Sequence, residues 1–290
     1  MKDFALLVGN DINNISSGKT WEDLLEDIIT YCGISHINRK DKPFPMLYEE
    51  IFLNAIRTKM MDEKDLKTYI ANEVSKIVPN VIHERIRSLN VPHIMTTNYE
   101  FSIEGESPKG NSGLVVERSY SVFRKYELNG STYWHLHGDC NNPASINLGY
   151  EHYCGQLQNM RNYTATGTTY KTEGVLKKPL IKRLSSGGQI NYQSWIDLFF
   201  TKDIYILGLG LDYVESDLWW LITYRARNKF YKNKVSINNK ISYFIPIEFE
   251  ERSKAKLEVL RANDINVIVV DAQKGVVYYK SVLDRLERLL

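Results

Sequence analysis

Apolar residues along the chain follow two periodicities, which predict strands that alternate with helices. Short apolar runs bounded by turn residues are typical of buried strands. They occupy residues 4–8, 91–95, 204–207, 241–247 and 265–270. Apolar residues at helical spacing occupy the stretches 20–32, 46–60, 62–78, 80–89, 217–230, 248–261 and 280–290. Thr20 is the expected N-cap of the first of these helices. This alternation predicts an α/β fold, with a Rossmann-like, mostly parallel sheet flanked by helices.

The middle of the chain departs from the alternation. The sequence predicts a helical subdomain at residues 33–90. It also predicts an insertion at residues 139–192, which we expect to cover the functional site. Alternating residues at 119–126 and 132–137 flank Asn129-Gly130, a dipeptide that favours the tight turn of a β-hairpin. We expect residues 1–290 to form a single domain.

Composition excludes several classes of protein. The chain has 37 Lys and Arg against 35 Asp and Glu, so its net charge of +2 gives no reason to expect nucleic acid or an anionic membrane as partner. No apolar run reaches the length of a membrane span or matches a signal peptide. Cys32, Cys140 and Cys154 are too few and too scattered for a disulfide framework or a four-cysteine zinc site. We therefore expect a cytoplasmic protein.

Polar segments follow the first two predicted strands, where open α/β sheets bind ligands. In Gly9-Asn10-Asp11, a glycine lets the backbone approach a phosphate, although the same residues also suit a plain turn. In Thr97-Asn98, the amide can bond to sugar hydroxyls or to a water, or it can cap the next helix.

Two further segments also place histidines or glycines at the end of a predicted strand. His135 and His137 point to one face of a strand, where a histidine suits general base catalysis. Two hydrogen-bonded structural histidines and a metal-binding pair are the alternatives. Gly208 and Gly210 follow the strand at 204–207, where they permit either close approach of a ligand or a tight turn.

In this order, the four segments resemble the sirtuin fold family. They are Leu7-Val8-Gly9-Asn10-Asp11-Ile12-Asn13, Thr96-Thr97-Asn98-Tyr99-Glu100, His135-Leu136-His137-Gly138-Asp139 and Gly208-Leu209-Gly210-Leu211-Asp212. Asn98 falls on the family's catalytic asparagine, and Glu100 stands where its motif has aspartate. His137 matches the catalytic histidine that precedes a glycine. The stretch from Gly208 to Leu221 is the longest match, and it is similar to sirtuin-like proteins of bacterial antiphage defence.

The resemblance implies an NAD+ hydrolase that releases nicotinamide and ADP-ribose, with NAD+ as substrate and no metal. Asn98 would orient water and ribose hydroxyls, and His137 would act as base. The residues implied to bind NAD+ are Gly9, Asn10, Asp11, Asn13, Thr97, Gly208, Gly210, Asp212 and Asp271. The chain lacks the two cysteine pairs that form the zinc ribbon of sirtuin deacylases, which weakens a deacylase function.

A biological role also follows from the resemblance. Similarity to the NADase domain of Thoeris effectors and to stand-alone Kongming-type subunits implies abortive infection by NAD+ depletion. We expect no sensor domain after the last helix, so control would come from homo-oligomerisation or from a separate sensor protein. A non-catalytic subunit that senses NAD or ADP-ribose, an NAD-dependent protein deacylase and an ADP-ribosyltransferase are the alternatives.

Overall fold

A parallel sheet organises the computed structural model, which describes residues 3–15, 21–115, 119–188, 190–231 and 235–290. The described strands are β1 (Phe4–Val8), β2 (His93–Thr96), β3 (Tyr126–Leu128), β4 (Ser131–His135), β5 (Asp203–Leu207), β6 (Ile241–Pro246) and β7 (Ile265–Val270). They form a seven-stranded sheet in the order β3-β4-β2-β1-β5-β6-β7. β3 pairs antiparallel with β4, and every other neighbouring pair is parallel. The predicted Rossmann-like α/β fold is therefore confirmed, and the strand order reverses between β1 and β5.

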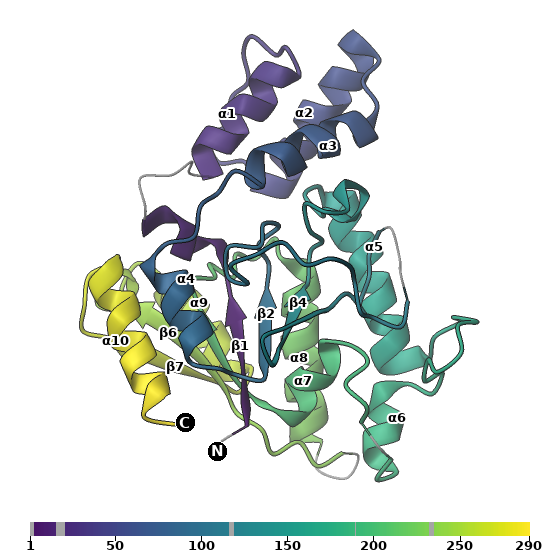
Figure 1. Ribbon diagram of the computed structural model, residues 1–290, viewed down its shortest axis with the longest axis vertical. Coiled ribbons are helices and arrows are strands. Elements are labelled where there is room, and N and C mark those ends of the chain that lie inside the picture. The colour runs from purple at the N-terminus through teal and green to yellow at the C-terminus, as the bar shows by residue number, and fades with distance from the viewer. Residues whose placement is uncertain (1–2, 16–20, 116–118, 189, 232–234) are drawn as a thin grey trace.

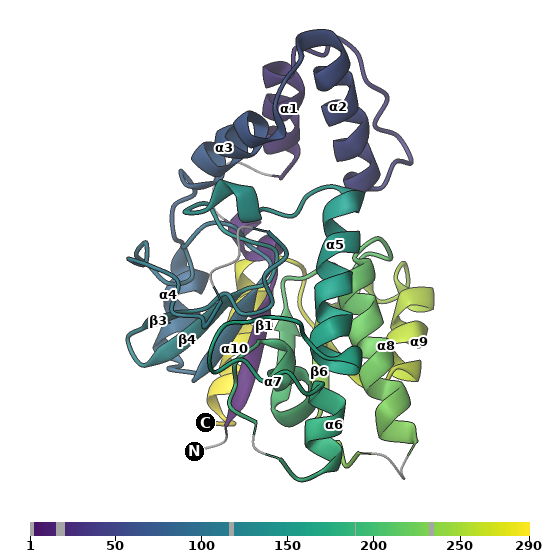
Figure 2. The same cartoon turned by 90° about the vertical axis from the view of Figure 1, so that its right-hand side faces the viewer.

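Helices cover both faces of this sheet (Figures 1 and 2). The described helices of the chain are α1 (Trp21–Tyr31), α2 (Phe44–Lys59), α3 (Glu63–Val74), α4 (Val81–Ser88), α5 (Tyr150–Arg161), α6 (Leu180–Ser185), α7 (Ile196–Thr201), α8 (Ser216–Phe230), α9 (Lys254–Ala262) and α10 (Val276–Glu287). Short 3₁₀ turns lie at Asn10–Ile15, Pro143–Ser145 and Ile247–Phe249, and a π turn lies at Asn162–Thr166. No helix in the described part of the chain is both long and apolar enough to cross a membrane.

Successive side chains of β1 point to opposite faces of the sheet, so they pack against the two layers of helices in turn. Phe4, Leu6 and Val8 pack with residues of α4 and α10, whereas Ala5 and Leu7 face the core formed with α7 and α8. Since all of β1 is buried, its sequence reads as one continuous apolar run.

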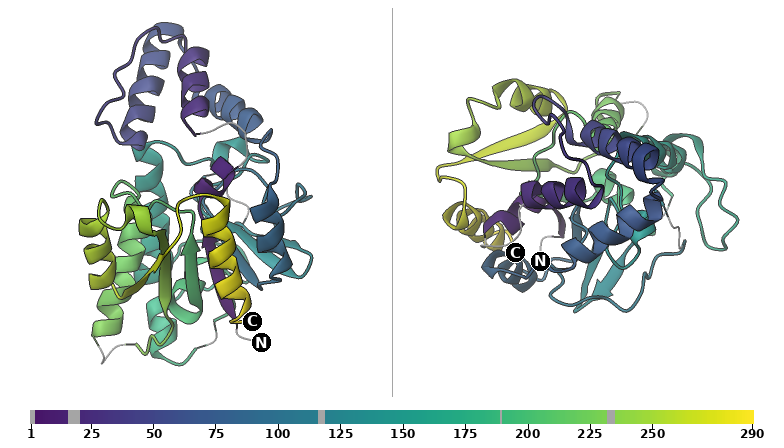
Figure 3. Two further views of the ribbon diagram at one scale, coloured as in Figure 1. Left: turned by 90° about the vertical axis from the view of Figure 1, so that its left-hand side faces the viewer. Right: turned by 90° about the horizontal axis from the view of Figure 1, so that it is seen from above.

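A separate group of helices stands over the carboxyl ends of the strands (Figure 3). α1, α2 and α3 share an apolar core with Tyr99, Ile146 and Leu148 from the loops beneath them. α4 lies instead on the sheet, against α10. The three helices thus form a cap above the end of the sheet at which ligands bind in this type of fold.

Some predicted elements differ from the structure. Of the strand predicted at 119–126, only Tyr126 is in a strand, because residues 121–124 are all buried and do not alternate between two faces. The hairpin at Asn129-Gly130 is confirmed, with positive φ angles of 51° and 82°. The helix predicted at 248–261 divides into a 3₁₀ turn and α9, and α10 begins at Val276 rather than at residue 280. The expected N-cap, Thr20, lies outside the described residues.

Candidate functional site

A cavity of about 510 Å³ lies between the carboxyl ends of the strands and the cap. Its volume is within the range of small-molecule sites, and its position includes the point where the strand order reverses. Leu24, Phe44 and Val74 of the cap line one side of it. Of the described residues in 139–192, Tyr153 alone reaches the lining, so the cover comes from α1–α3 and not from the predicted insertion.

Most of the predicted site residues line this one cavity. They are Asn10, Asp11, Thr97, Asn98, His137, Gly208, Gly210 and Asp212. Gly9, Asn13 and Asp271 do not line it. Asp271 is exposed at the end of edge strand β7, and Lys274 lines the cavity from the same loop. Asn13 is buried behind Asn10, to which it donates a hydrogen bond of 2.6 Å.

Gly9 has a structural role that differs from the predicted contact with a phosphate. Its N–H bonds to the carbonyl of Leu207 at 3.0 Å, and the N–H of Asp11 bonds to the carbonyl of Gly208 at 3.0 Å. A Cβ atom at position 9 would collide with the backbone of Gly208 and Leu209. A glycine is therefore required because two backbone segments cross here, and the crossing fixes the loops after β1 and β5 against each other.

Backbone and side-chain contacts hold Asn98 at the end of β2. The Thr96 hydroxyl donates to the carbonyl of Val8 at 2.9 Å and accepts from the N–H of Asn98 at 3.0 Å. The Asn98 amide group donates through Nδ2 to Glu100 Oε1 at 3.2 Å. A carboxylate accepts hydrogen bonds, so this contact sets the orientation of the amide. Asn98 Oδ1 is buried and has no hydrogen-bond partner among the described residues.

Glu100 belongs to a buried relay that reaches α4. Asn13 Nδ2 donates to Glu100 Oε1 at 2.9 Å, and His83 Nε2 contacts Asn13 Oδ1 at 2.9 Å. Burial lowers the pKa of His83 to about 4, so its ring is neutral and Nε2 donates while Nδ1 accepts from the N–H of Asn80. Burial also raises the pKa of Glu100. Glu100 thus connects Asn98 to the loop after β1.

His137 follows β4 and is paired with an acid that sequence reasoning missed. Its Nε2 lies 2.9 Å from Asp217 Oδ2, and both side chains are buried. Asp217 Oδ1 accepts from the N–H of Leu218 at 2.8 Å, so the carboxylate is itself fixed at the start of α8. Burial lowers the pKa of His137, but the charge and hydrogen bond of Asp217 outweigh it and raise the pKa above its ordinary value. Because Nε2 donates to Asp217, Nδ1 holds the lone pair of the neutral ring.

His135 is a buried structural residue and not part of the cavity lining. Its Nδ1 lies 2.8 Å from the carbonyl of Asn98, and its Nε2 lies 2.8 Å from Glu104 Oε1. Both partners are acceptors, so both ring nitrogens donate and the imidazole is cationic. Burial lowers the pKa of His135, but Glu104 raises it above the ordinary value. His135 therefore supports the backbone of Asn98 from below.

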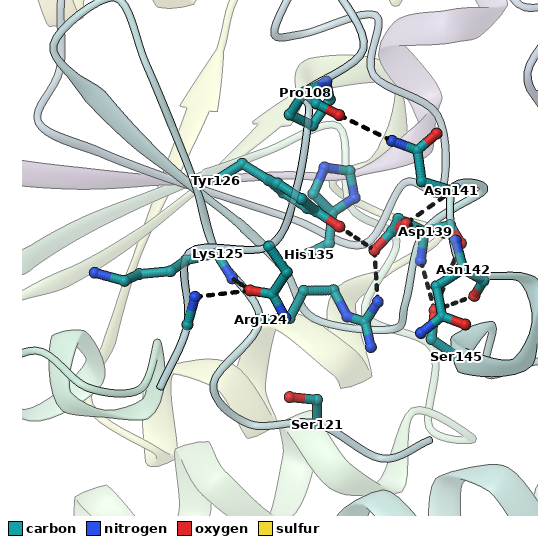
Figure 4. A network of polar contacts seen from close by, with 12 residues as sticks. Pro108, Ser121, Arg124, Lys125, Tyr126, His135, Asp139, Asn141, Asn142 and Ser145 are labelled. Carbon is teal, nitrogen blue, oxygen red and sulfur yellow. Dashed lines mark hydrogen bonds and ion pairs between the residues drawn. The ribbon is translucent and has the colours of Figure 1, made fainter. Parts of the chain in front are cut away.

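A further buried ion pair holds the loop after His137 (Figure 4). Arg124 Nη1 lies 2.6 Å from Asp139 Oδ2, and the hydroxyl of Tyr126 donates to the same oxygen at 2.8 Å. Asp139 Oδ1 accepts from the N–H groups of Asn141 and Asn142 at 3.0 and 3.1 Å. The carboxylate is thus fully satisfied, and it fixes the turn that positions His137.

Comparisons with known proteins assign no family to this geometry. No protein-family model matches the chain, and no curated protein matches its sequence. Among the described residues, no group of three or more His, Cys, Asp or Glu could hold a metal ion. The chemistry of the cavity therefore has to be inferred from its own side chains.

Charged side chains of both signs line the cavity. Arg252, Lys256 and Lys274 line its β6–β7 end, where Lys256 Nζ donates to the carbonyl of Gly210 at 2.6 Å and the Arg252 guanidinium lies over the ring of Phe249. Four acids near the ends of the strands, Asp11, Glu100, Asp212 and Glu215, line the same cavity, and Asp11 forms an ion pair with Lys274. Sequence reasoning missed these cations, although Arg252 and Lys256 have the spacing of one helix face.

Proposed function

We propose that the chain is an NAD+ glycohydrolase, which cleaves NAD+ to nicotinamide and ADP-ribose. One observation carries the proposal: Asn98 and His137, which follow the neighbouring strands β2 and β4, line the same cavity. Asn98 offers a buried carbonyl oxygen that has no hydrogen-bond partner in the described part of the chain, and Asp217 orients the ring of His137. An amide acceptor and an oriented imidazole are the groups needed to hold a water and to remove its proton.

The charge distribution supports NAD+ as the substrate. This dinucleotide has an anionic pyrophosphate at its centre and a cationic nicotinamide ring at one end. The cations Arg252, Lys256 and Lys274 would face the pyrophosphate, and the glycines Gly208 and Gly210 would let the backbone approach it. The pyridinium would then lie beside His137 and the acids Glu100 and Glu215. Asn10, Asp11, Thr97 and Asp212 supply further polar groups for the ribose hydroxyls.

The reaction then requires little covalent chemistry from the protein. The bond between C1′ and the nicotinamide nitrogen breaks, its electron pair neutralises the pyridinium, and charge develops on the ribose as in glycoside hydrolysis. Asn98 Oδ1 accepts a hydrogen bond from the attacking water, and His137 Nδ1 takes its proton as the new O–C1′ bond forms. General base catalysis of this kind contributes about 10²- to 10⁴-fold to a rate.

We further propose that the reaction serves antiphage defence by depletion of NAD+. This role rests on the sequence resemblance, and it requires that activity be restrained until infection, by oligomerisation or by a separate sensor protein. Bacteria that express the chain with its partner should lose NAD+ after phage infection, whereas cells with Asn98→Ala should not. Unchanged NAD+ in infected wild-type cells, under conditions in which the purified protein is active, would contradict the defensive role alone.

Product analysis separates this activity from its alternatives. Purified protein is incubated with NAD+ over a range of protein concentrations, with and without candidate partners, and the products are separated by chromatography. Equal amounts of nicotinamide and ADP-ribose are expected. Nicotinamide release that depends on an added acyl-lysine peptide would indicate a deacylase, and ADP-ribose attached to protein would indicate a transferase. NAD+ binding without turnover in every condition would indicate a sensor subunit.

A further inference from the structure

Glu215 is an acid of the cavity to which the mechanism above gives no role. It is the residue before α8, at the N-cap position, where an acidic side chain would normally bond to free backbone N–H groups. Its side chain makes no such capping bond. It lines the cavity instead, and its Oε2 atom is buried without a hydrogen-bond partner among the described residues. The side chain is thus not used to stabilise the helix.

His137 and Glu215 are electrostatically coupled through the start of α8. Asp217, two residues after Glu215, holds the ring of His137, and Glu215 raises the pKa of that ring. Burial in turn raises the pKa of Glu215 to about 7, while His137 lowers it. The other titratable groups that act on Glu215, or on which it acts, are Asp212 of the same loop, Tyr99 after β2, Tyr153 of α5 and Tyr243 of β6.

A role in proton transfer would account for Glu215, and this inference rests on the proposed hydrolase activity. We propose that Glu215 is the second proton carrier of the site, which receives from His137 the proton of the attacking water and passes it to solvent. The water oxygen bonds to C1′, and its proton moves to His137 Nδ1. That proton then moves to the Glu215 carboxylate and from there to solvent, since the residue is not fully buried, which returns both groups to their starting states. No oxidant or reductant is needed.

The arrangement also explains how His137 can work as a base despite its raised pKa. A ring that holds its proton tightly accepts it readily from water but releases it slowly. A neighbouring carboxyl group whose pKa lies near neutral pH can take that proton and exchange it with solvent. Turnover should therefore increase as the pH rises through the pKa values of this coupled pair.

Glu215→Gln tests the proposal, because it retains the size of the side chain and removes its capacity to accept a proton. We expect kcat to fall about tenfold or more, with the KM for NAD+ changed by about twofold or less. The midpoint of the pH profile should move to lower pH, because the charge that raises the pKa of His137 is lost. Glu258→Gln, the same change at an exposed position on α9 outside the cavity lining, should leave both quantities unchanged.

The outcomes separate this inference from the proposed function. Glu215→Gln with wild-type kcat and an unmoved pH profile, beside an active wild type, would overturn the role of Glu215 alone. A lower kcat at every pH with an unmoved midpoint would indicate a structural residue, and it would also overturn the role. A wild type that releases no nicotinamide in any condition would overturn the hydrolase proposal, and the role of Glu215 with it.

Discussion

Asp217→Asn is the substitution for which the structure predicts the largest effect without a change in shape. The aspartate lies 2.9 Å from His137 Nε2, and both side chains are buried. At this separation a carboxylate and an imidazolium attract each other by about 6 kcal/mol at an effective dielectric constant of about 20, before the cost of desolvation. Loss of part of this attraction, together with the tautomer change that an amide permits, should lower kcat by about 10²- to 10⁴-fold.

Nicotinamide release and NAD+ binding, measured on the same preparations, test this prediction. Binding of NAD+ by Asp217→Asn should change by about threefold or less, because Asp217 contacts His137 and does not line the cavity. Asp65→Asn, an exposed substitution on α3, should behave as wild type. A kcat within about twofold of wild type would refute the role assigned to the pair.

The stability of the same variant should depend on pH. Asp217 raises the pKa of His137 in the folded protein, so the pair stabilises the fold most below the unfolded pKa of about 6.5, and this contribution is lost as the pH rises through the folded pKa. The difference in free energy of unfolding between wild type and Asp217→Asn should therefore be larger at about pH 5.5 than at about pH 9. Equal differences at both values would contradict the assigned pKa shift.

Three further substitutions test the contacts that hold the loops of the site in place. Glu100→Ala removes the acceptor that orients Asn98, and kcat should fall about tenfold while the KM for NAD+ changes less. Gly9→Ala should lower the free energy of unfolding in urea by about 1–3 kcal/mol, because its Cβ would collide with backbone, whereas Gly110→Ala, with open space around it, should not. Arg124→Met leaves a buried carboxylate without its cation and should cost about 3–5 kcal/mol in the same assay, so a loss below about 1 kcal/mol would contradict the importance of this pair.

Local patterns were sufficient to predict most of the sheet. β1 is apolar at every position because both of its faces are covered, and Asn129-Gly130 has the turn chemistry of a hairpin. The strand predicted at 119–126 is wrong because Arg124 is buried by pairing with Asp139. A sequence pattern treats such an arginine as a solvent-facing position, so burial that depends on a distant partner cannot be seen in it.

Of the residues in the site, sequence patterns could predict only those that lie at the ends of strands. Asn98 follows a strand that the apolar pattern predicts, and His137 ends the alternating segment at 132–137. The topology then brings the two residues together. Asp217 is 80 positions from His137, and no local pattern records that pairing. Gly9 was predicted as a phosphate-binding position because sequence cannot distinguish a backbone crossing from a ligand contact. Asp271, also predicted to bind NAD+, is exposed at the end of edge strand β7 and does not line the cavity.

One comparison tests the central claim most directly: nicotinamide release by wild type, Asn98→Ala and His137→Ala, with NAD+ binding measured on each preparation. Our account predicts that wild type releases nicotinamide and ADP-ribose, and that both variants bind NAD+ while release falls by about 10²-fold or more. Release at the wild-type rate by either variant would contradict the assignment of these residues. Binding of NAD+ by wild type without release, at any protein concentration and with any partner, would contradict the hydrolase itself.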